Sequence, residues 1–155
     1  MPVADSSAHF QVEYTDEAKR FLYRRRAATH GAFFLPYLKT GMRLLDCGCG
    51  PGSITVDWAM IVVPGEVVGI DLDPAQVELA RNHAKSVGVT NVRFEQGNVQ
   101  QLPYEDQSFD AVFVHGVIEY LPDPIQAFGE IRRVLKPDGV LGARHSDWGS
   151  FLFSP

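Results

Sequence analysis

Short apolar runs alternate along the chain with segments of helical periodicity. The runs predict strands at residues 43–47, 67–71, 92–96, 110–116 and 140–144. Between them, apolar side chains recur at spacings of three and four, as on one face of a helix, and the clearest set is Val77, Ala80, Ala84 and Val87. Strands that are apolar on both faces and alternate with amphipathic helices are typical of α/β proteins, so we expect a doubly wound, mostly parallel sheet.

Capping residues and prolines mark the helices of this pattern. Asp73 before Pro74 is a helix start, with a cap followed by proline at the first helical position. Another helix is expected to open at Pro122–Pro124 and to turn toward the sheet Ile125, Phe128, Ile131 or Arg132, and Leu135. Residues 136–139, KPDG, are expected to form a turn.

Two helices are expected before the first strand. The first carries Ala18, Phe21, Leu22 and Arg25, and the second covers residues 27–38, where Pro36 should kink or shorten it. Residues 1–13 are expected to form a loose leader. We therefore divide the single domain into an N-terminal helical segment, residues 1–38, and an α/β core, residues 39–155.

Composition narrows the class of protein. The 155 residues are 45% hydrophobic and 21% charged, as in soluble globular proteins. No apolar run approaches the roughly 20 residues that cross a bilayer, and the first residues lack the basic start and apolar core of a secretory signal. We expect a cytoplasmic protein without membrane contact. The formal charge of −5 argues against a nucleic-acid partner.

Two small clusters have ordinary explanations. The basic run Arg24–Arg26 fits the solvated face of a helix, and a grip on an anionic substrate is the alternative. Cys47 and Cys49 lack the further Cys or His ligands that a zinc site needs. We interpret them as small side chains that fill a tight turn, and no metal site is predicted.

The stretch LLDCGCGPGS, residues 44–53, places three glycines directly after the first expected strand. Glycine lets a backbone turn sharply beside a ligand, and ligands of doubly wound sheets bind at the carboxyl ends of the strands. A dinucleotide is disfavoured because Ser53 stands where its fingerprint requires the third glycine, and because Asp46 would repel a pyrophosphate. A cationic ammonium group would be attracted instead.

Asp71 ends the second expected strand, about 20 residues beyond the glycines. A carboxylate at this point accepts both hydroxyl hydrogens of a ribose, which indicates a nucleoside. Taken with Asp46, it predicts a nucleoside that carries a cationic, amino-acid-like group and no phosphate. S-adenosylmethionine fits that description.

Four stretches, in this order, resemble the class I S-adenosylmethionine-dependent methyltransferases, within the small-molecule group that includes the ubiquinone- and menaquinone-biosynthesis type. They are LLDCGCGPGS, VVGIDLDP, VRFEQGNVQQLPYEDQSFDAVFVHGVIEYLPDP and LKPDGVL, and they span about residues 40–145. The resemblance implies a Rossmann-like fold and in-line methyl transfer from S-adenosylmethionine to a small-molecule acceptor, with S-adenosylhomocysteine as product. It also implies that residues 1–38 cover the cofactor site.

The resemblance assigns residues to each part of the cofactor. The assignments are Asp46, Gly48, Cys49 and Gly50 along the methionine part, Asp71 on the ribose diol, Leu72 against the adenine with Gln76 nearby, Gly97, Asn98 and Val99 at the adenine edge, and His115 and Gly116 facing the methyl donor and the acceptor. The family usually has Asp at position 98. Asn98 accepts through its carbonyl oxygen without the charge, so somewhat lower cofactor affinity is expected.

Each assignment has a plainer alternative. The glycines can simply permit a turn, Asp71 can cap the following helix, and Asn98 and Val99 can be loop residues. His115 is either a pocket-lining residue without chemistry or a general base. Because nothing in the sequence identifies the acceptor, no catalytic residue is assigned.

Other functions stay open beside methyl transfer. The chain could be a cofactor-binding module or a truncated fragment without turnover. An aminopropyl transferase would carry an acidic polyamine motif after the fourth strand, where only Glu119 occurs. A nicotinamide oxidoreductase conflicts with Asp46 and with the glycine spacing.

The chain stops early in comparison with this family. Relatives usually continue past the fifth strand with a helix and an antiparallel pair, whereas this sequence ends at RHSDWGSFLFSP. We therefore expect a sheet that lacks the last antiparallel strands, with its fifth strand as a bare edge beside Trp148, Phe151, Leu152 and Phe153. Such edges invite pairing with another chain, so self-association is expected.

Overall fold

The computed structural model describes residues 15–145. The expected leader, residues 1–13, and the apolar residues Trp148, Phe151, Leu152 and Phe153 lie outside the described residues. The helices are α1 (Asp16–Tyr23), α2 (Ala27–His30), α3 (Ser53–Val62), α4 (Pro74–Ser86) and α5 (Pro124–Val134), with the short 3-10 helices η1 (Leu35–Tyr37) and η2 (Ile118–Tyr120). The strands are β1 (Leu44–Cys47), β2 (Val67–Asp71), β3 (Val92–Gln96), β4 (Phe109–His115) and β5 (Leu135–Arg144).

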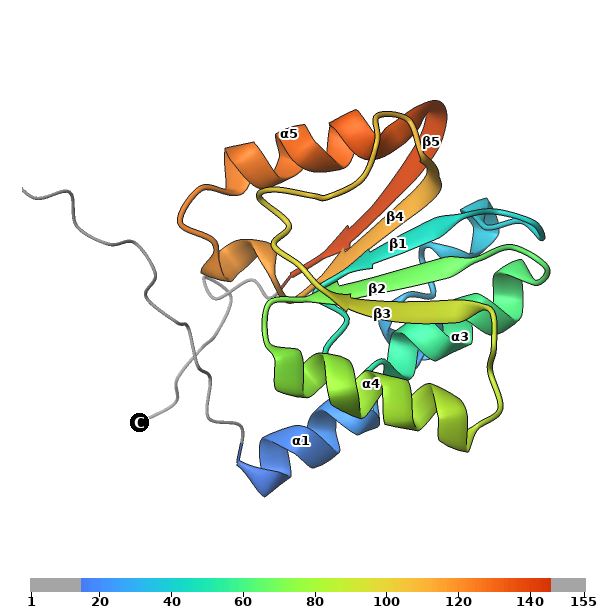
Figure 1. Cartoon of the computed structure of the whole chain (residues 1–155), viewed down its shortest axis with the longest axis vertical. Coiled ribbons are helices and arrows are strands. Elements are labelled where there is room, and N and C mark those ends of the chain that lie inside the picture. The colour runs from blue at the N-terminus through green and yellow to red at the C-terminus, as the bar shows by residue number, and fades with distance from the viewer. Residues whose placement is uncertain (1–14, 146–155) are drawn as a thin grey trace, which may run out of the picture.

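Within the described residues, the strands form one sheet in the order β3-β2-β1-β4-β5, and every neighbouring pair is parallel. α5 covers one face of the sheet, while α3 and α4 cover the other (Figure 1). The direction of chain progression reverses between β1 and β4, which places the switch point where these two strands end. The predicted doubly wound α/β fold is confirmed.

β1 is buried on both faces because it lies in the middle of the sheet. Leu45 belongs to the apolar cluster under α5, which includes Ile131, and Leu44 belongs to the cluster under α3, which includes Trp58. Successive side chains of a strand point to opposite faces, so both clusters need apolar residues from this one strand. Full burial of such a side chain contributes about 1.5–3 kcal/mol.

The prediction of a single helix over residues 27–38 is wrong. α2 ends at His30, and the chain turns at Gly31, where a Cβ atom would collide with the indole ring of Trp58. The turn sends Phe34 into the core, where its ring centroid lies 5.7 Å from that of Trp58 and 5.5 Å from that of Phe113. A continuous helix would not bring Phe34 to this position.

The inward face expected for α5 is partly wrong. Ile125 is 82% exposed and Phe128 is 40% exposed, whereas Ala127, Ile131 and Val134 are buried against the sheet. The apolar residues of this segment are compatible with two neighbouring faces of the helix. In the structure, α5 packs on the sheet through the face that holds the small residue Ala127.

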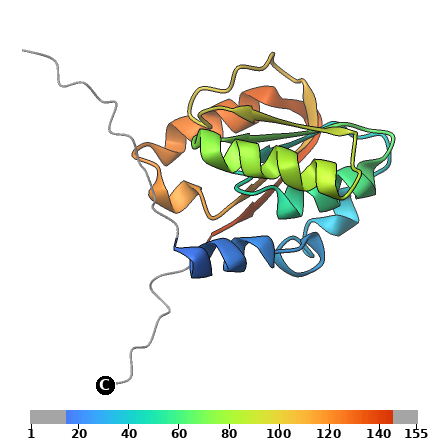
Figure 2. The same ribbon diagram turned by 60° about the horizontal axis from the view of Figure 1, so that its bottom comes forward.

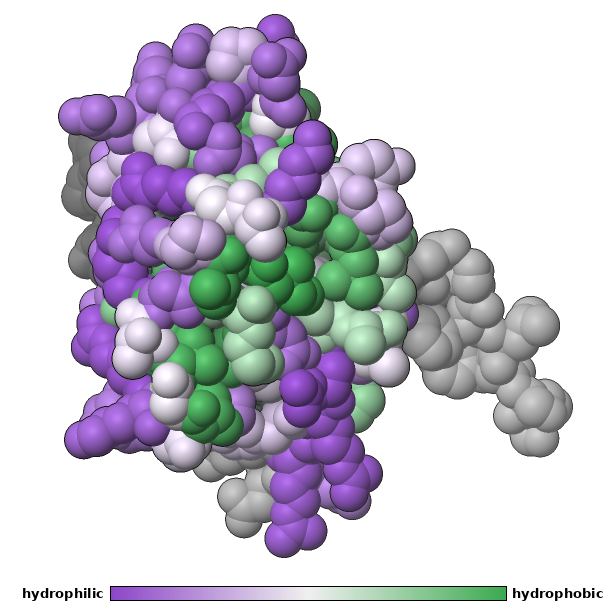
Figure 3. All heavy atoms as spheres, turned by 90° about the vertical axis from the view of Figure 1, so that its right-hand side faces the viewer, coloured by the Kyte–Doolittle hydropathy of each residue, from purple (hydrophilic) through white to green (hydrophobic). Residues whose placement is uncertain are grey.

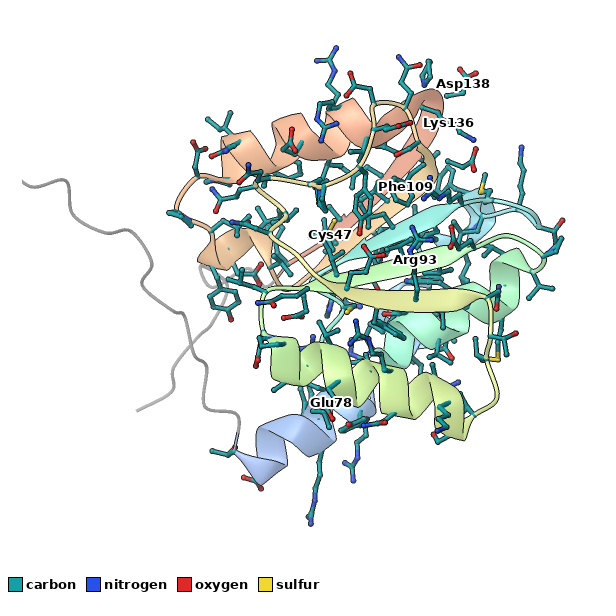
Figure 4. The ribbon with its side chains drawn as sticks, viewed as in Figure 1. Cys47, Glu78, Arg93, Phe109, Lys136 and Asp138 are labelled. Atoms are coloured by element: carbon teal, nitrogen blue, oxygen red, sulfur yellow. The ribbon has the colours of Figure 1, made fainter. Side chains whose placement is uncertain are left out.

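The turn expected at residues 136–139 lies inside β5 as a bulge. The pairing steps from Phe109 with Leu135 to Ala111 with Val140, so the four residues face a single residue of β4. That residue is Asp110, whose carboxylate accepts hydrogen bonds from Lys136 Nζ (2.6 Å) and from the Arg43 N–H (2.8 Å). Figure 4 shows Lys136 and Asp138 at this end of β5.

Residues 15–38 are fastened to the core at α3. The Asp57 carboxylate accepts hydrogen bonds from the Ala27 N–H (2.8 Å) and from Arg26 Nε (2.9 Å) and Nη2 (2.6 Å). Ser53 Oγ donates to the Leu22 carbonyl (2.9 Å). Figure 2 shows α1 and the segment after it packed along this side of the molecule. Because α1 ends at Tyr23, the Arg24–Arg26 run does not form the solvated helix face that was expected.

Exposed apolar side chains lie at the end of the sheet that faces away from the carboxyl ends of the strands. Figure 3 shows them gathered on the face that includes the carboxyl ends of α3 and α4. Met60, Val63 and Val87 in this region are each about half exposed. In the part of the chain that the structure describes, no helix is long and apolar enough to span a bilayer.

We predict that Asp57→Ala lowers the free energy of unfolding by roughly 2 kcal/mol, because a buried charged acceptor with several donors contributes on that scale. Urea unfolding followed by circular dichroism measures the change. Arg26→Gln should cost much less, since the Arg26 side chain is 60% exposed and regains water when unpaired. Equal losses in the two variants would contradict the anchoring role of Asp57.

β5 pairs with β4 on one side, and none of residues 15–145 pairs with its other side. We propose that this edge associates with a second copy of the chain, as bare edges do. Light scattering at tens of micromolar should then give a mass that rises with concentration. Leu141→Lys should suppress the rise, and Met60→Lys, on α3, should not. A monodisperse monomer at every concentration would count against the proposal.

Candidate functional site

The glycine loop, residues 48–52, connects β1 to α3 at the carboxyl edge of the sheet. Gly52 has φ of 78°, and a Cβ atom there would lie 2.8 Å from Ala80 Cβ and 2.9 Å from a ring carbon of Phe94. A Cβ on Gly48 would collide with the side chain of Val117, which follows β4. Glycine is therefore required where the loop closely approaches α4, β3 and the segment after β4. The turn alternative and the ligand assignment are both compatible with this requirement.

Asp71, the last residue of β2, joins the loops around the site. Its carboxylate accepts hydrogen bonds from the Gly50 N–H (2.8 Å) and the Asp73 N–H (3.0 Å), and its backbone carbonyl accepts one from the Gly97 N–H (3.0 Å). Each carboxylate oxygen keeps capacity for a further donor. The cap of α4 is instead Asp73, which accepts from the Ala75 N–H, so the alternative role of Asp71 as helix cap is wrong.

Asp46 lies behind the glycine loop and is only 3% exposed. Thr55 Oγ1, in the first turns of α3, donates to its carboxylate at 2.6 Å. Burial raises the pKa of Asp46 to about 7; the hydrogen bond from Thr55 opposes the rise, and the charge of Asp71 adds to it. Burial is also the chief cause that raises the pKa of Asp71, with a contribution from the charge of Asp73. No cation is among these causes, and Asp46 adds its negative charge to that of Asp71 only as the pH rises past about 7.

Gln76 is buried against the glycine loop, at 4% exposure. Its Oε1 atom has no hydrogen-bond partner among the described residues and lies 3.9 Å from the position that a Cβ of Gly50 would take. A buried amide oxygen without a donor is costly, so a bound molecule that donates a proton here would relieve it. The carboxylates and this amide therefore form a set of acceptors that fits a ligand rich in hydroxyl and ammonium donors.

Cys49 and Leu72 flank this set of acceptors. The Cys49 thiol is buried, burial raises its pKa well above the usual range, and Sγ donates to the Gly50 carbonyl at 3.6 Å. This fits the expected space-filling role. Leu72 is 55% exposed at the end of β2, and its carbonyl accepts from Gln96 Nε2 at 3.1 Å. Its contact with adenine stays a prediction.

The loop after β3 meets the site through its backbone. Gly97 packs at 3.5 Å, measured from an ideal Cβ, against Ile70. Asn98 is exposed, and its Oδ1 accepts from the Gln100 N–H at 2.9 Å, while Val99 is buried in the cluster under α5. Val99 therefore offers a ligand its backbone rather than its side chain. The adenine contacts assigned to this loop stay predictions.

His115 and Gly116 end β4 beside the N-terminal segment. Arg25 Nη1 lies 3.2 Å from His115 Nδ1, and the His30 ring meets the His115 ring edge-on with centroids 5.6 Å apart. Burial, together with the charges of Arg25, Arg144 and His30, lowers the pKa of His115 to about 4. A histidine with this pKa is neutral near pH 7 and a weak base, which disfavours the general-base alternative.

Three residues near the site were not singled out by their sequence pattern. Thr55 could have been found as the hydroxyl in the first turns of the helix after the glycines. Arg144 pairs in register with His115, so it follows from the strand ends once the sheet order is known. Arg25 was part of the basic run, but its position depends on a contact 90 residues away. Within the described residues, no group of three or more His, Cys, Asp or Glu could hold a metal ion.

Residues 38–149 match a family model described as a methyltransferase domain. The chain belongs to this methyltransferase family. The resemblance identified from its four sequence stretches is confirmed.

Relatives of this methyltransferase chain agree with the assignment. A probable methyltransferase, ltbC, of Aspergillus luteorubrus is 35% identical over 145 residues, which are 88% of this chain and 51% of that protein. A demethylmenaquinone methyltransferase of Lactobacillus johnsonii is 38% identical over 107 residues, 68% of this chain and 44% of that protein. A SAM-dependent methyltransferase from Aquifex aeolicus superposes with a TM-score of 0.65 at 27% identity, covering 70% of this chain and 59% of that one. The chain spans about half the length of the curated relatives it matches.

We predict that Asp46 makes the stability of this methyltransferase chain fall with rising pH. Its pKa of about 7 when folded exceeds the unfolded value of about 3.9, so the folded state binds the proton more tightly between these values. Its contribution is present below about pH 4, is lost as the pH rises to about 7 and is constant above that. In Asp46→Asn, which keeps an acceptor for Thr55, this loss should disappear.

Urea unfolding of both proteins at about pH 5 and about pH 8 tests this prediction. The unfolding free energy of the variant relative to the wild type should increase between the two pH values. Because all other carboxyl groups are common to both proteins, the difference isolates Asp46. The same difference at both pH values would show that Asp46 is ionised over the whole range.

Proposed function

We propose that this chain is the core of an S-adenosylmethionine-dependent methyltransferase that acts on a small-molecule acceptor. The observation that carries the proposal is the set of acceptors at the carboxyl ends of β1 and β2. They are two carboxyls whose pKa shifts have no cation among their causes, and the buried Gln76 Oε1, which has no hydrogen-bond partner among the described residues. These groups suit a ligand with a ribose diol and an ammonium group, and they do not suit a pyrophosphate. Family membership and the Aquifex aeolicus structure support the same cofactor.

The residues proposed to hold the cofactor are Asp46, Gly48, Cys49 and Gly50 at the methionine part, Asp71, Leu72 and Gln76 at the nucleoside, Gly97, Asn98 and Val99 at the adenine edge, and His115 and Gly116 at the methyl end. When bound, S-adenosylmethionine supplies a methyl group that its sulfonium has already activated. The main task left to the protein is to place the acceptor in line with that methyl, and such placement supplies several kcal/mol.

Other contacts support the glycine loop and set the tautomer of His115. Val117 packs on the glycine loop, and Ser53 ties the loop to Leu22 of the N-terminal segment. His115 Nδ1 accepts from Arg25 Nη1, since a guanidinium only donates, and the neutral ring therefore carries its proton on Nε2. On this proposal, the Nε2 hydrogen of His115 is available for a hydrogen bond to the acceptor. A cytoplasmic location and the lack of a nucleic-acid partner stay predictions from composition and charge.

Calorimetric titration with S-adenosylmethionine tests the cofactor. We expect micromolar binding to the wild type, no binding of NADH, and affinity at least about tenfold lower in Asp71→Ala, because hydrogen bonds to a charged group contribute about 1.5–3 kcal/mol. Asp138→Ala removes the same side chain from the far end of β5 (Figure 4) and should bind normally. Failure of the wild type to bind, or an equal loss in Asp138→Ala, would refute the cofactor site.

Turnover separates an enzyme from a binding module. We expect S-adenosylhomocysteine to form when the loaded chain meets a panel of small phenols, amines, thiols and carboxylates, and not in Asp71→Ala at the same cofactor concentration. Tight cofactor binding with no product on any acceptor would favour the alternative, a binding module or fragment without turnover.

A further inference from the structure

The carboxyl edge of the sheet is divided by charge. Asp46 is the last residue but one of β1 and Asp71 ends β2, whereas β4 and β5 end in His115 and Arg144, which are paired in register. The acidic half is the proposed cofactor site. The basic half lies on the side where His115 and Gly116 face the methyl end, and nothing in the proposed cofactor contacts accounts for its charge.

Arg25 reaches the basic half from the N-terminal segment. Its Nη1 lies 3.2 Å from His115 Nδ1 and 3.8 Å from the position of an ideal Cβ on Gly116. The Phe21 ring supports the guanidinium, whose central carbon lies 5.2 Å from the ring centroid. The guanidinium is thus held at the end of β4 rather than extended into solvent.

Arg144 reaches the same place from β5. Its Nη1 donates to the carbonyls of Thr29 (3.2 Å) and His30 (3.1 Å), and the His30 ring contacts the His115 ring. Two guanidinium groups and two imidazole rings from three separate segments therefore converge where β4 and β5 end. We refer to Arg25, His30, His115 and Arg144 as the basic cluster.

The charges that lower the pKa of the two imidazoles are all positive. Arg25, Arg144 and His30 act on His115, and the two arginines also act on His30. No carboxylate is among the groups that shift either imidazole. This gathering of cations stands out in a chain with a formal charge of −5. A surface that carries one sign of charge raises the local concentration of ligands of the opposite sign.

We infer that the methyl acceptor carries an anionic oxygen group, a carboxylate being the simplest, which binds between Arg25 and Arg144 and accepts the Nε2 hydrogen of His115. This inference rests on the proposed function and specifies the substrate class of that site. Guanidinium groups bind carboxylates through paired hydrogen bonds, which orient as well as attract. The anion would also lie beside the cationic sulfonium side of the site, where opposite charge is favourable.

The probe is benzoate, with benzamide as a neutral match and benzylamine as a cationic one. Each is titrated into the chain saturated with S-adenosylhomocysteine, and the imidazole signals of His115 and His30 are followed by NMR. We expect benzoate to shift both rings saturably, with an affinity at least tenfold higher than that of benzamide, and benzylamine to leave them unchanged.

Variants locate the site. Arg25→Gln and Arg144→Gln should each weaken benzoate binding at least tenfold, and Arg25→Lys, which keeps the charge, should weaken it less than Arg25→Gln. Arg24→Gln is the matched control, because it removes the same charge from an exposed neighbour. If Arg144→Gln fails to fold, as judged by circular dichroism, the three variants at positions 24 and 25 decide the question.

Calorimetry with S-adenosylhomocysteine on every variant keeps the two proposals apart. A wild type that does not bind S-adenosylhomocysteine refutes the proposed function. A wild type that binds it but takes benzamide as well as benzoate, or loses as much benzoate affinity in Arg24→Gln as in Arg25→Gln, refutes the anionic acceptor alone. Selective benzoate binding that depends on Arg25 and not on Arg24 establishes the inference.

Discussion

The hydrogen bond from the Gly50 N–H to the Asp71 carboxylate is the contact on which the geometry of the site depends. It joins the end of β2 to the glycine loop that leaves β1, and the same residue also holds the backbone of Asp73 and Gly97. Three loops that belong to different strands therefore share one fixed point. Without it, the sheet would still be held by its apolar clusters, but the acceptors at its carboxyl edge would lose their relative positions.

The fold could be predicted because a parallel sheet covered on both faces restricts its strands to apolar runs. The bounds of β2 and β3 agree with the sequence pattern for this reason. The prediction from this pattern was wrong at two apolar residues outside the strands. Phe34 interrupts an expected helix because its ring packs in the core, and Ile125 stays exposed because α5 is buried through Ala127, Ile131 and Val134 instead.

The residues of the candidate site also differ in how far the sequence could predict them. Asp46 and Asp71 follow from strand ends and glycine spacing, which are local in sequence. Arg25 and Arg144 do not, because their neighbours lie 90 and about 115 residues away in the chain. No periodicity links such residues. The basic run at positions 24–26 had two interpretations in the sequence. Because α1 ends at Tyr23, its three side chains do not share one helix face and lie in separate surroundings.

The hydrogen bond from Ser53 Oγ to the Leu22 carbonyl makes the N-terminal segment and the glycine loop direct neighbours. Order gained by one of them therefore restricts the other. Energetic coupling between two binding events is reciprocal. If a ligand at the glycine loop raises the affinity for a ligand at the N-terminal segment by some factor, the second ligand raises the affinity for the first by the same factor. A single hydroxyl group at the start of α3 thus connects the glycine loop directly with the segment that carries Arg25.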